Sequence, residues 1–168
     1  MEVYYSREQQ KKYSVVGIEL EEESLQRFLA GQTGAMPYCS GYGTALQEIC
    51  SGLKETHWIW YIFPMIKGLT PDTVTEYYAL KNKKEAREYT AHPVLGARLI
   101  EITEKLLELE TSDPVTVFGM TDAFKLHACM TLFDEIAPEQ AVFHKVLEKF
   151  CLGRKQEDTL RILSYDKT

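Results

Sequence analysis

Apolar residues recur with the spacing of an α-helix along most of the chain. The clearest case follows a stretch rich in glycine, 31–43, which is expected to be a loop. After it, apolar side chains repeat at i, i+3, i+4, i+7, i+8 and i+11. They are Tyr42, Ala45, Leu46, Ile49, Cys50 and Leu53. This spacing places them on one face and predicts an amphipathic helix.

Other helical patterns begin at residues that commonly start helices, either a side-chain cap or a proline in the first turn. The expected starts are Ser24, Thr70-Pro71, Asn82 with Glu85 three residues later, His92-Pro93, Asp113-Pro114, Thr121-Asp122 and Pro138. The pattern after Asp113-Pro114 is a short turn that ends near Gly119. Gly153 is expected to end the helix from Pro138, and a last short helix is expected over 158–163.

The segment 57–64 reads His-Trp-Ile-Trp-Tyr-Ile-Phe-Pro and holds both tryptophans of the chain. Rigid apolar surface of this size is either buried in a core or presented to a partner. Periodicity does not separate a strand from a buried helix in so short a run. We favour a helix, because the neighbouring elements are helical and a lone strand has nothing to pair with.

Together these elements predict an all-α protein, a single compact multihelical domain of about seven to nine helices over 24–163. Residues 1–23 are expected to be an irregular lead-in, with 13–20 as the one candidate for a short extended segment. Residues 164–168 are expected to be a polar tail. A chain of 168 residues buries enough surface to need no disulfide or metal for stability.

Composition narrows the partners. The net charge of −6 disfavours non-specific binding to nucleic acid, which wants a basic surface. The four cysteines are far apart and form no Cys-x-x-Cys pair, so we expect them reduced and the protein cytoplasmic. The first residues carry no apolar core of a secretory signal, and no apolar run approaches the ~20 residues that cross a bilayer.

The predicted helix over 122–136 is apolar around most of its circumference and is therefore expected to be central. At about 100° per residue, Lys125 shares a face with Asp122, whereas His127 and Thr131 lie nearly opposite. A buried charge costs several kcal/mol unless it is paired. Lys125 is thus expected to reach water, to pair with a carboxylate or to face a ligand cavity. His127 is either hydrogen-bonded to a backbone carbonyl or an acid–base group.

A site between the aromatic segment and this helix would suit a small, flat, anionic molecule such as a nucleotide, because rings stack on it and a cation holds its charge. The candidate catalytic residues are His57, Lys125 and His127. The candidate ligand-binding residues are Trp58, Trp60, Tyr61, Arg98 and Thr131. Core packing explains the aromatic residues equally, and a surface ion pair explains Arg98.

Two further interpretations stay open. The basic run Lys81, Lys83, Lys84 and Arg87 is either a solvated helix face or a site for phosphate or an acidic partner. The chain is either a ligand-binding domain or a non-catalytic protein-interaction module with an exposed apolar patch. No phosphate-binding glycine loop, no catalytic serine motif and no clustered metal-ligand spacing occurs, so no cofactor or metal is expected. Whether the chain is an enzyme stays open.

Several sequence blocks resemble the family catalogued as domain of unknown function 1810. The most specific are His57-Trp58-x-Trp60-x-x-Phe63-Pro64, Ala91-His92-Pro93-Val94-Leu95-Gly96-x-Arg98-Leu99 and Asp122-x-x-Lys125-Leu126 followed by Met130-Thr131-Leu132-Phe133. Looser blocks extend the resemblance from about Leu25 to Leu163. It implies a compact multihelical cytoplasmic domain, found largely in bacteria, and it implies no reaction.

The chain also departs from the pattern of that family. The segment before His57 is usually more basic and here includes Glu55. The proline of the aromatic block is usually followed by glutamine and here by Met65. Two serines usually precede Met130, where this chain has Ala128 and Cys129. If the usual polar residues contact a ligand, this chain binds that ligand differently or has lost it.

Overall fold

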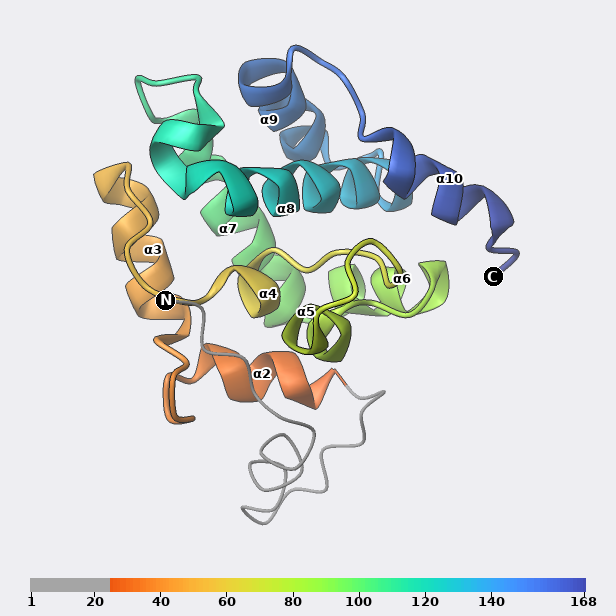
Figure 1. The fold of residues 1–168 in the computed structure, drawn as a ribbon, viewed down its shortest axis with the longest axis horizontal. Helices are drawn as coiled ribbons and strands as arrows, with labels where there is room; N and C mark the ends of the chain where they lie inside the picture. Colours follow the sequence, from red (N-terminus) through yellow and green to blue (C-terminus); the bar gives the residue numbers. More distant parts are fainter. Residues whose placement is uncertain (1–24) are drawn as a thin grey trace.

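The computed structural model describes residues 25–168, in which nine helices carry the regular structure (Figure 1). Their bounds are α2 Gln26–Gln32, α3 Gly41–Ser51, α4 Ile59–Ile62, α5 Thr73–Tyr78, α6 Lys83–Ala91, α7 Leu95–Leu107, α8 Pro114–Ile136, α9 Ala141–Cys151 and α10 Glu157–Tyr165. Within the described residues, pairing between extended segments is limited to one bridge, between Ile66 and Leu80. The all-α prediction is therefore confirmed.

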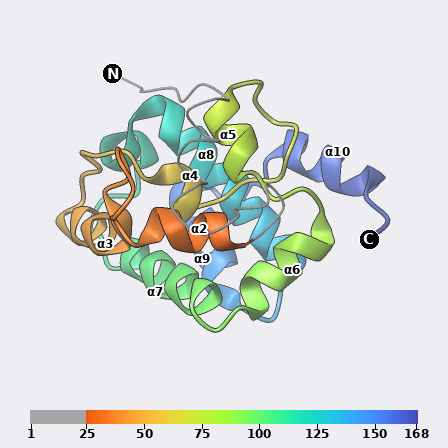
Figure 2. The same cartoon turned by 90° about the horizontal axis from the view of Figure 1, so that it is seen from below.

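Helix α8 lies at the centre of the fold and packs against α4, α6, α9 and α10 (Figures 1 and 2). It is buried around most of its circumference after residue 122, as the sequence predicts. Gly119, with φ 76° and ψ 168°, interrupts it, so the short predicted turn and the long helix are two helical segments joined at a bend. The backbone N–H of Lys54 donates to Val117 O at 2.8 Å and ties the first segment to the loop after α3.

The structure confirms some predicted helix starts and moves others. Asn82 accepts a hydrogen bond from Glu85 N at 2.9 Å and caps α6, as expected. Helix α5 begins two residues after Thr70-Pro71, because Asp72 is the side-chain cap and accepts from Thr75 N at 2.9 Å. Helix α9 begins at Ala141, three residues after Pro138, because the intervening residues form a turn.

The start of α7 shows a cap that periodicity does not reveal. The ring nitrogen Nδ1 of His92 accepts hydrogen bonds from Val94 N and Leu95 N, each at 3.1 Å. His92 therefore satisfies backbone donors in the first turn of α7, as side-chain caps do. The prediction that His92-Pro93 opens this helix is right in place, although the regular helix begins at Leu95.

The predicted boundaries of one loop and of the tail shift. The loop 31–43 is shorter than expected, because α2 includes Gly31 and α3 begins at Gly41. A Cβ at Gly31 would lie 2.7 Å from the Tyr61 ring, so this glycine serves close packing and not a turn. Helix α10 extends to Tyr165, which leaves a tail of 166–168. Ser24 and the lead-in 1–23 lie outside the described residues.

The aromatic segment forms a single helical turn, α4, which agrees with the preference for helix over strand. Trp58, Tyr61 and Phe63 are fully buried in the core, whereas Trp60 is half-buried. An irregular loop, 52–58, joins α3 to this turn and passes beside α8. The polar side chains around that loop form the most connected polar cluster near the aromatic segment.

Candidate functional site

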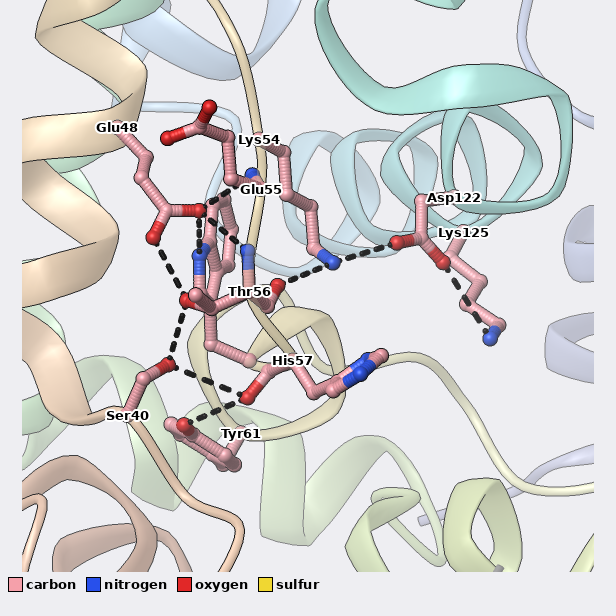
Figure 3. Close-up of polar contacts among 10 residues, drawn as sticks. Ser40, Glu48, Lys54, Glu55, Thr56, His57, Tyr61, Asp122 and Lys125 are labelled. Carbon is pink, nitrogen blue, oxygen red and sulfur yellow. Dashed lines mark hydrogen bonds and ion pairs between the residues drawn. The ribbon is translucent and has the colours of Figure 1, made fainter. Parts of the chain in front are cut away.

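Glu48 on α3 holds the loop 52–58 in place (Figure 3). Its carboxylate accepts hydrogen bonds from Glu55 N at 2.5 Å, Thr56 N at 2.7 Å, the Thr56 hydroxyl at 2.6 Å and Trp58 Nε1 at 3.0 Å. Burial disfavours the charged carboxylate, but these donors outweigh that effect and hold the pKa of Glu48 below its usual value. The carboxylate thus stays ionised at neutral pH and fixes the loop backbone.

Lys54 carries the polar cluster from this loop to α8. Its ammonium lies 2.8 Å from Asp122 Oδ2, donates to Thr56 O at 2.7 Å and lies 5.1 Å from the centre of the Trp58 ring. Asp122 Oδ1 in turn lies 3.5 Å from Lys125 Nζ. Figure 3 shows Glu48 on one side of the loop and the Asp122–Lys125 pair on the other.

Lys125 is only 5% exposed, so its charge is held inside the fold. Among the alternatives that the sequence left open, the structure shows pairing with a carboxylate, through Asp122 one turn earlier on α8. The ammonium also lies 5.2 Å from the centre of the Trp60 ring, a distance at which a cation is attracted to the ring face. Pairing and ring contact together offset the cost of burying this charge.

Trp60 brings two candidate residues together. The His57 ring stacks on the Trp60 ring, with centroids 6.4 Å apart and an interplanar angle of 27°. Lys125 contacts the same indole. The indole Nε1 of Trp60 is buried and has no hydrogen-bond acceptor among residues 25–168. A buried donor without an acceptor costs roughly 1–3 kcal/mol, so this N–H is a candidate for a hydrogen bond to a bound group.

A small cavity adjoins this indole. Its volume is about 10 Å³, which is about the space of one water-sized atom. Its wall residues come from α4, α5, α8 and the segment after α4. They are Ile59, Trp60, Phe63, Met65, Thr75, Tyr78 and Lys125.

The hydroxyl of Thr75 is a second polar group in this wall. It is buried without an aligned hydrogen-bond partner, although it lies close to the carboxylate of Asp72. The cavity wall thus combines a cation with an indole N–H that lacks an acceptor among the described residues and a hydroxyl that lies beside a carboxylate.

Trp58 and Tyr61, two of the candidate ligand-binding residues, support the loop and do not line the cavity. Trp58 is bonded to Glu48 as described above. The Tyr61 hydroxyl donates to His57 O at 3.1 Å and accepts from Gly41 N at 3.2 Å. Burial raises the pKa of Tyr61 to about 12, so its hydroxyl stays protonated. Both side chains position His57 through the backbone of the loop.

Arg98 does not join the cavity either. Its guanidinium donates to Gln32 Oε1 at 3.2 Å and lies 5.0 Å from the centre of the Tyr42 ring. These contacts connect α7 to α2 and α3. The alternative of a surface ion pair is not seen for Arg98 within the described part of the chain, and its role as a ligand clamp stays a prediction.

His127 and Thr131 lie on the other face of α8, where they hold the segment that leads into α10. His127 Nε2 lies 2.7 Å from Arg154 O, and Thr131 Oγ1 accepts from Gln156 N at 2.9 Å. His127 is thus bonded to a backbone carbonyl, which is one of its two expected roles. These two candidates do not share a site with His57 and Lys125.

Glu48 and Lys54 are central residues of this cluster to which the sequence assigned no role. For Glu48 a signal was available. The available signal was an acidic side chain next to Ile49 on the apolar face of α3, where a carboxylate requires buried donors. Over residues 25–168, no three histidine, cysteine or acidic side chains are grouped so that they could hold a metal ion. None of the helices in this range has the length and apolarity needed to cross a membrane.

The fold has a counterpart among solved structures. It is similar to the crystal structure of the conserved hypothetical protein Rv1873 from Mycobacterium tuberculosis, with a TM-score of 0.79 and 28% sequence identity. The similarity covers 86% of this chain and 99% of that one. No curated protein matches the sequence.

A family model matches nearly the whole described chain, over residues 22–163. Its description is protein of unknown function, DUF1810. The resemblance in the aromatic, His-Pro and Met-Thr-Leu-Phe blocks is therefore confirmed. The chain belongs to the DUF1810 family of proteins of unknown function.

Proposed function

We propose that this chain binds a small anionic ligand, nucleotide-like in having a flat ring, beside Trp60. One oxygen of the anionic group takes the single-atom cavity, and the ring lies outside it against His57. The observation that carries the proposal is the buried indole N–H of Trp60, which belongs to the cavity wall and has no acceptor in the described part of the chain. An anionic oxygen would satisfy this donor with a charge-assisted hydrogen bond.

The charges around the cavity nearly cancel, so hydrogen bonds to the ligand matter more for this proposal than the net charge of the site. Lys54 and Lys125 share the carboxylate of Asp122. Asp72, whose carboxylate also lies near Lys125, accepts from Thr75 N and from the Thr70 hydroxyl. The cluster is therefore close to neutral. Binding would depend on hydrogen bonds and on stacking with the half-buried rings of His57 and Trp60.

Met65 gives a reason why the indole lacks a partner in this chain. It lines the cavity, and it stands where the family resemblance described above implies a glutamine. A glutamine there would offer an amide oxygen to the cavity, whereas a methionine offers only a weak sulfur acceptor. The departure at Met65 thus leaves the donor available to an external oxygen.

Binding is the function that we propose. In a reaction at this site, His57 would be the acid or base, because its ring stacks on Trp60. A cytoplasmic location belongs to the same proposal, since none of the four cysteines forms a disulfide within the described residues, which fits a reducing compartment.

The first test is the substitution Trp60→Phe, which keeps an aromatic ring and removes the indole N–H. We expect the variant to stay folded, because a phenyl ring still offers Lys125 a ring face. We expect affinity for AMP or ADP-ribose, measured by calorimetry and thermal shift, to fall about tenfold or more, the loss of one charge-assisted bond. For the unchanged protein, a ligand at 100 times its Kd adds about 2.7 kcal/mol.

One control and one further variant accompany this test. Lys105 forms a surface pair with Glu108, and Lys105→Ala removes a lysine without touching the cavity, so its ligand affinity should match the unchanged protein. Lys125→Met should weaken binding as Trp60→Phe does. Equal affinity of the Trp60→Phe variant and the unchanged protein, or no shift with any anionic probe, would refute the proposal.

A protein-interaction module is the second candidate, and one observation favours it. Met120 and Phe124, one turn apart on α8, are 79% and 39% exposed. Two side chains make a smaller surface than the extended apolar patch expected of a helix-binding groove. The ligand site is therefore the function that the geometry supports better. A Phe124→Ser variant that keeps ligand binding would show that the ligand site does not depend on this apolar surface.

A further inference from the structure

A second cleft lies between α6, the end of α8 and α10, and none of its wall residues lines the Trp60 cavity. Its volume is about 300 Å³, the lower end of the range for small-molecule sites. In both orientations of the ribbon, α10 projects from the body of the fold beyond α6 (Figures 1 and 2).

One part of this cleft is apolar. Ile136 at the end of α8 contributes to it, together with Leu160 and Leu163 from α10. Leu163 belongs to the hydrophobic core, and Ile136 packs against that core. The apolar part of the cleft is thus backed by packed side chains and offers a surface for a hydrocarbon or aromatic group.

The facing wall carries two cations from α6. Lys83 and Arg87 are four residues apart and therefore lie on the same face of the helix. Glu135 is the acidic residue that lines the cleft, and its carboxylate lies 2.5 Å from Lys155 Nζ. That carboxylate is already paired, and the carboxylate of Asp166 lies near Lys83. The two cations exceed this one further carboxylate, so the wall opposite the apolar one keeps a net positive charge.

The tail of the chain shows that this wall accepts oxygen ligands. Asp166 Oδ2 accepts a hydrogen bond from Lys83 N at 2.5 Å. The carbonyl oxygen of Thr168 accepts from Arg87 NH1 at 2.9 Å. An anionic group and a carbonyl thus already approach α6 from the direction of α10, and the guanidinium of Arg87 has further N–H donors for a bound acid.

We infer that this cleft binds a small amphiphilic anion, an acid group joined to an apolar chain or ring. The acid group lies against Lys83 and Arg87, and the apolar body lies on Ile136, Leu160 and Leu163. Arginine holds carboxylates and phosphates alike through paired N–H donors, so the shared chemistry is the acid group and not its source. This gives the basic run of α6 a partner of defined chemistry.

Calorimetry with four probes tests the inference on the full chain. Hexanoate and hexyl phosphate carry both a charge and an apolar chain, acetate carries only the charge, and 1-hexanol carries only the chain. We expect at least one of the two amphiphilic anions to bind about tenfold or more tightly than both acetate and hexanol. The better of these two identifies a carboxylate or a phosphate as the acid group. Acetate or hexanol binding as tightly as both would overturn the inference.

Variants locate the binding. Arg87→Ala should lower affinity for the tighter probe about tenfold or more. Lys84→Ala is the matched control, since Lys84 is exposed and pairs with Glu88, and it should leave affinity unchanged. Ser164→Trp should block the cleft without removing a cation, with an unchanged circular dichroism spectrum as the check on folding. If Arg87→Ala and Ser164→Trp both bind the probe normally, the cleft is not the site.

Each of the two proposed sites can be refuted without refuting the other. Trp60→Phe should leave binding of the amphiphilic probe intact, and Arg87→Ala should leave AMP or ADP-ribose binding intact. If Trp60→Phe abolishes binding of the amphiphilic probe, that probe binds at the Trp60 cavity and the inference about the α6–α10 cleft is wrong.

Discussion

Glu48 shows how one buried carboxylate organises a loop that has no regular structure. Four donors from residues 55–58 meet its two oxygens, and the side chain is only 8% exposed. A loop without its own ladder of hydrogen bonds needs such an acceptor, since unpaired buried N–H groups are costly. His57 is therefore positioned by a residue that does not touch it.

Replacing this carboxylate should change both stability and its pH dependence. Glu48→Gln keeps the shape and loses the charge, so we expect unfolding free energy at pH 7 to fall by roughly 1–2 kcal/mol. Because the pKa of Glu48 is lowered in the folded state, the stabilisation is complete above its usual pKa of 4.5 and is lost as the pH falls through the lower folded value. The difference between variant and unchanged protein should thus shrink below about pH 4.5.

Denaturant unfolding from pH 3 to pH 7 measures this difference. Glu104 is exposed on α7, and Glu104→Gln serves as the matched control with no expected change. A Glu48→Gln difference that stays constant across the whole pH range would contradict the assigned role of the carboxylate.

Among the helices, the closest backbone approach at a glycine with negative φ is at Gly96 in α7. A Cβ at that position would lie 2.2 Å from Thr90 O of α6. Because the obstacle is backbone, it cannot turn aside, and the two helices would have to separate. We expect Gly96→Ala to lower unfolding free energy by roughly 1–3 kcal/mol.

Gly43 in α3 is the matched control, since a Cβ there would meet nothing within 4 Å. Gly43→Ala should raise stability by about 0.5–1 kcal/mol, because alanine favours the helix more than glycine does. Thermal or denaturant unfolding of both variants measures the contrast. Equal effects of the two substitutions would show that the α6–α7 contact is looser than the structure indicates.

A side chain of α8 anchors the start of helix α10. The buried hydroxyl of Thr131 accepts from Gln156 N, immediately before α10 begins. Thr131→Val keeps the shape and leaves that N–H unsatisfied, so we expect a loss of roughly 1–3 kcal/mol and faster amide exchange in α10.

Thr103→Val is the comparison for this anchor, because Thr103 is equally buried but its hydroxyl donates to Leu99 O within its own helix. That substitution should leave amide exchange in α10 unchanged. Exchange measured by mass spectrometry separates the two, and unchanged protection of α10 in the Thr131→Val variant would refute the anchor.

These elements also show how far the sequence could predict the structure. Helix existence, the central position of 122–136 and the cap at Asn82 depend on neighbours within a few residues, and they were predicted. The partners of His127 and Thr131 lie at least 25 positions further along the chain, so local patterns could not identify them. The sequence placed His57, Trp60 and Lys125 in one candidate site, which stays a prediction, and the structure places both His57 and Lys125 against the Trp60 ring. The size of the cavity beside that ring depends on packing that no periodicity encodes.

At the scale of the whole molecule, the core determines which thiols can react. Cys39 and Cys129 are buried, Cys151 is partly buried and Cys50 is exposed. Burial raises the pKa of Cys129 well above its usual value and that of Cys151 to about 11, so both stay protonated and unreactive near neutral pH.

We therefore expect one fast-reacting thiol in the native protein at pH 7.5 and four after denaturation, as measured with a colorimetric disulfide reagent. Cys50→Ser should remove the fast phase. A fast-reacting thiol that remains in that variant would mean that the packing around the buried cysteines opens more readily than the structure indicates.

The bend at Gly119 has a mechanical consequence. Lys54 contacts both sides of it, since its backbone N–H is bonded to Val117 before the bend and its ammonium to Asp122 after it. One residue thus links both segments of α8 to the 52–58 loop. A molecule that displaced this loop would have to move or break one of these two contacts, so occupancy near the aromatic turn is coupled to the bend in the central helix.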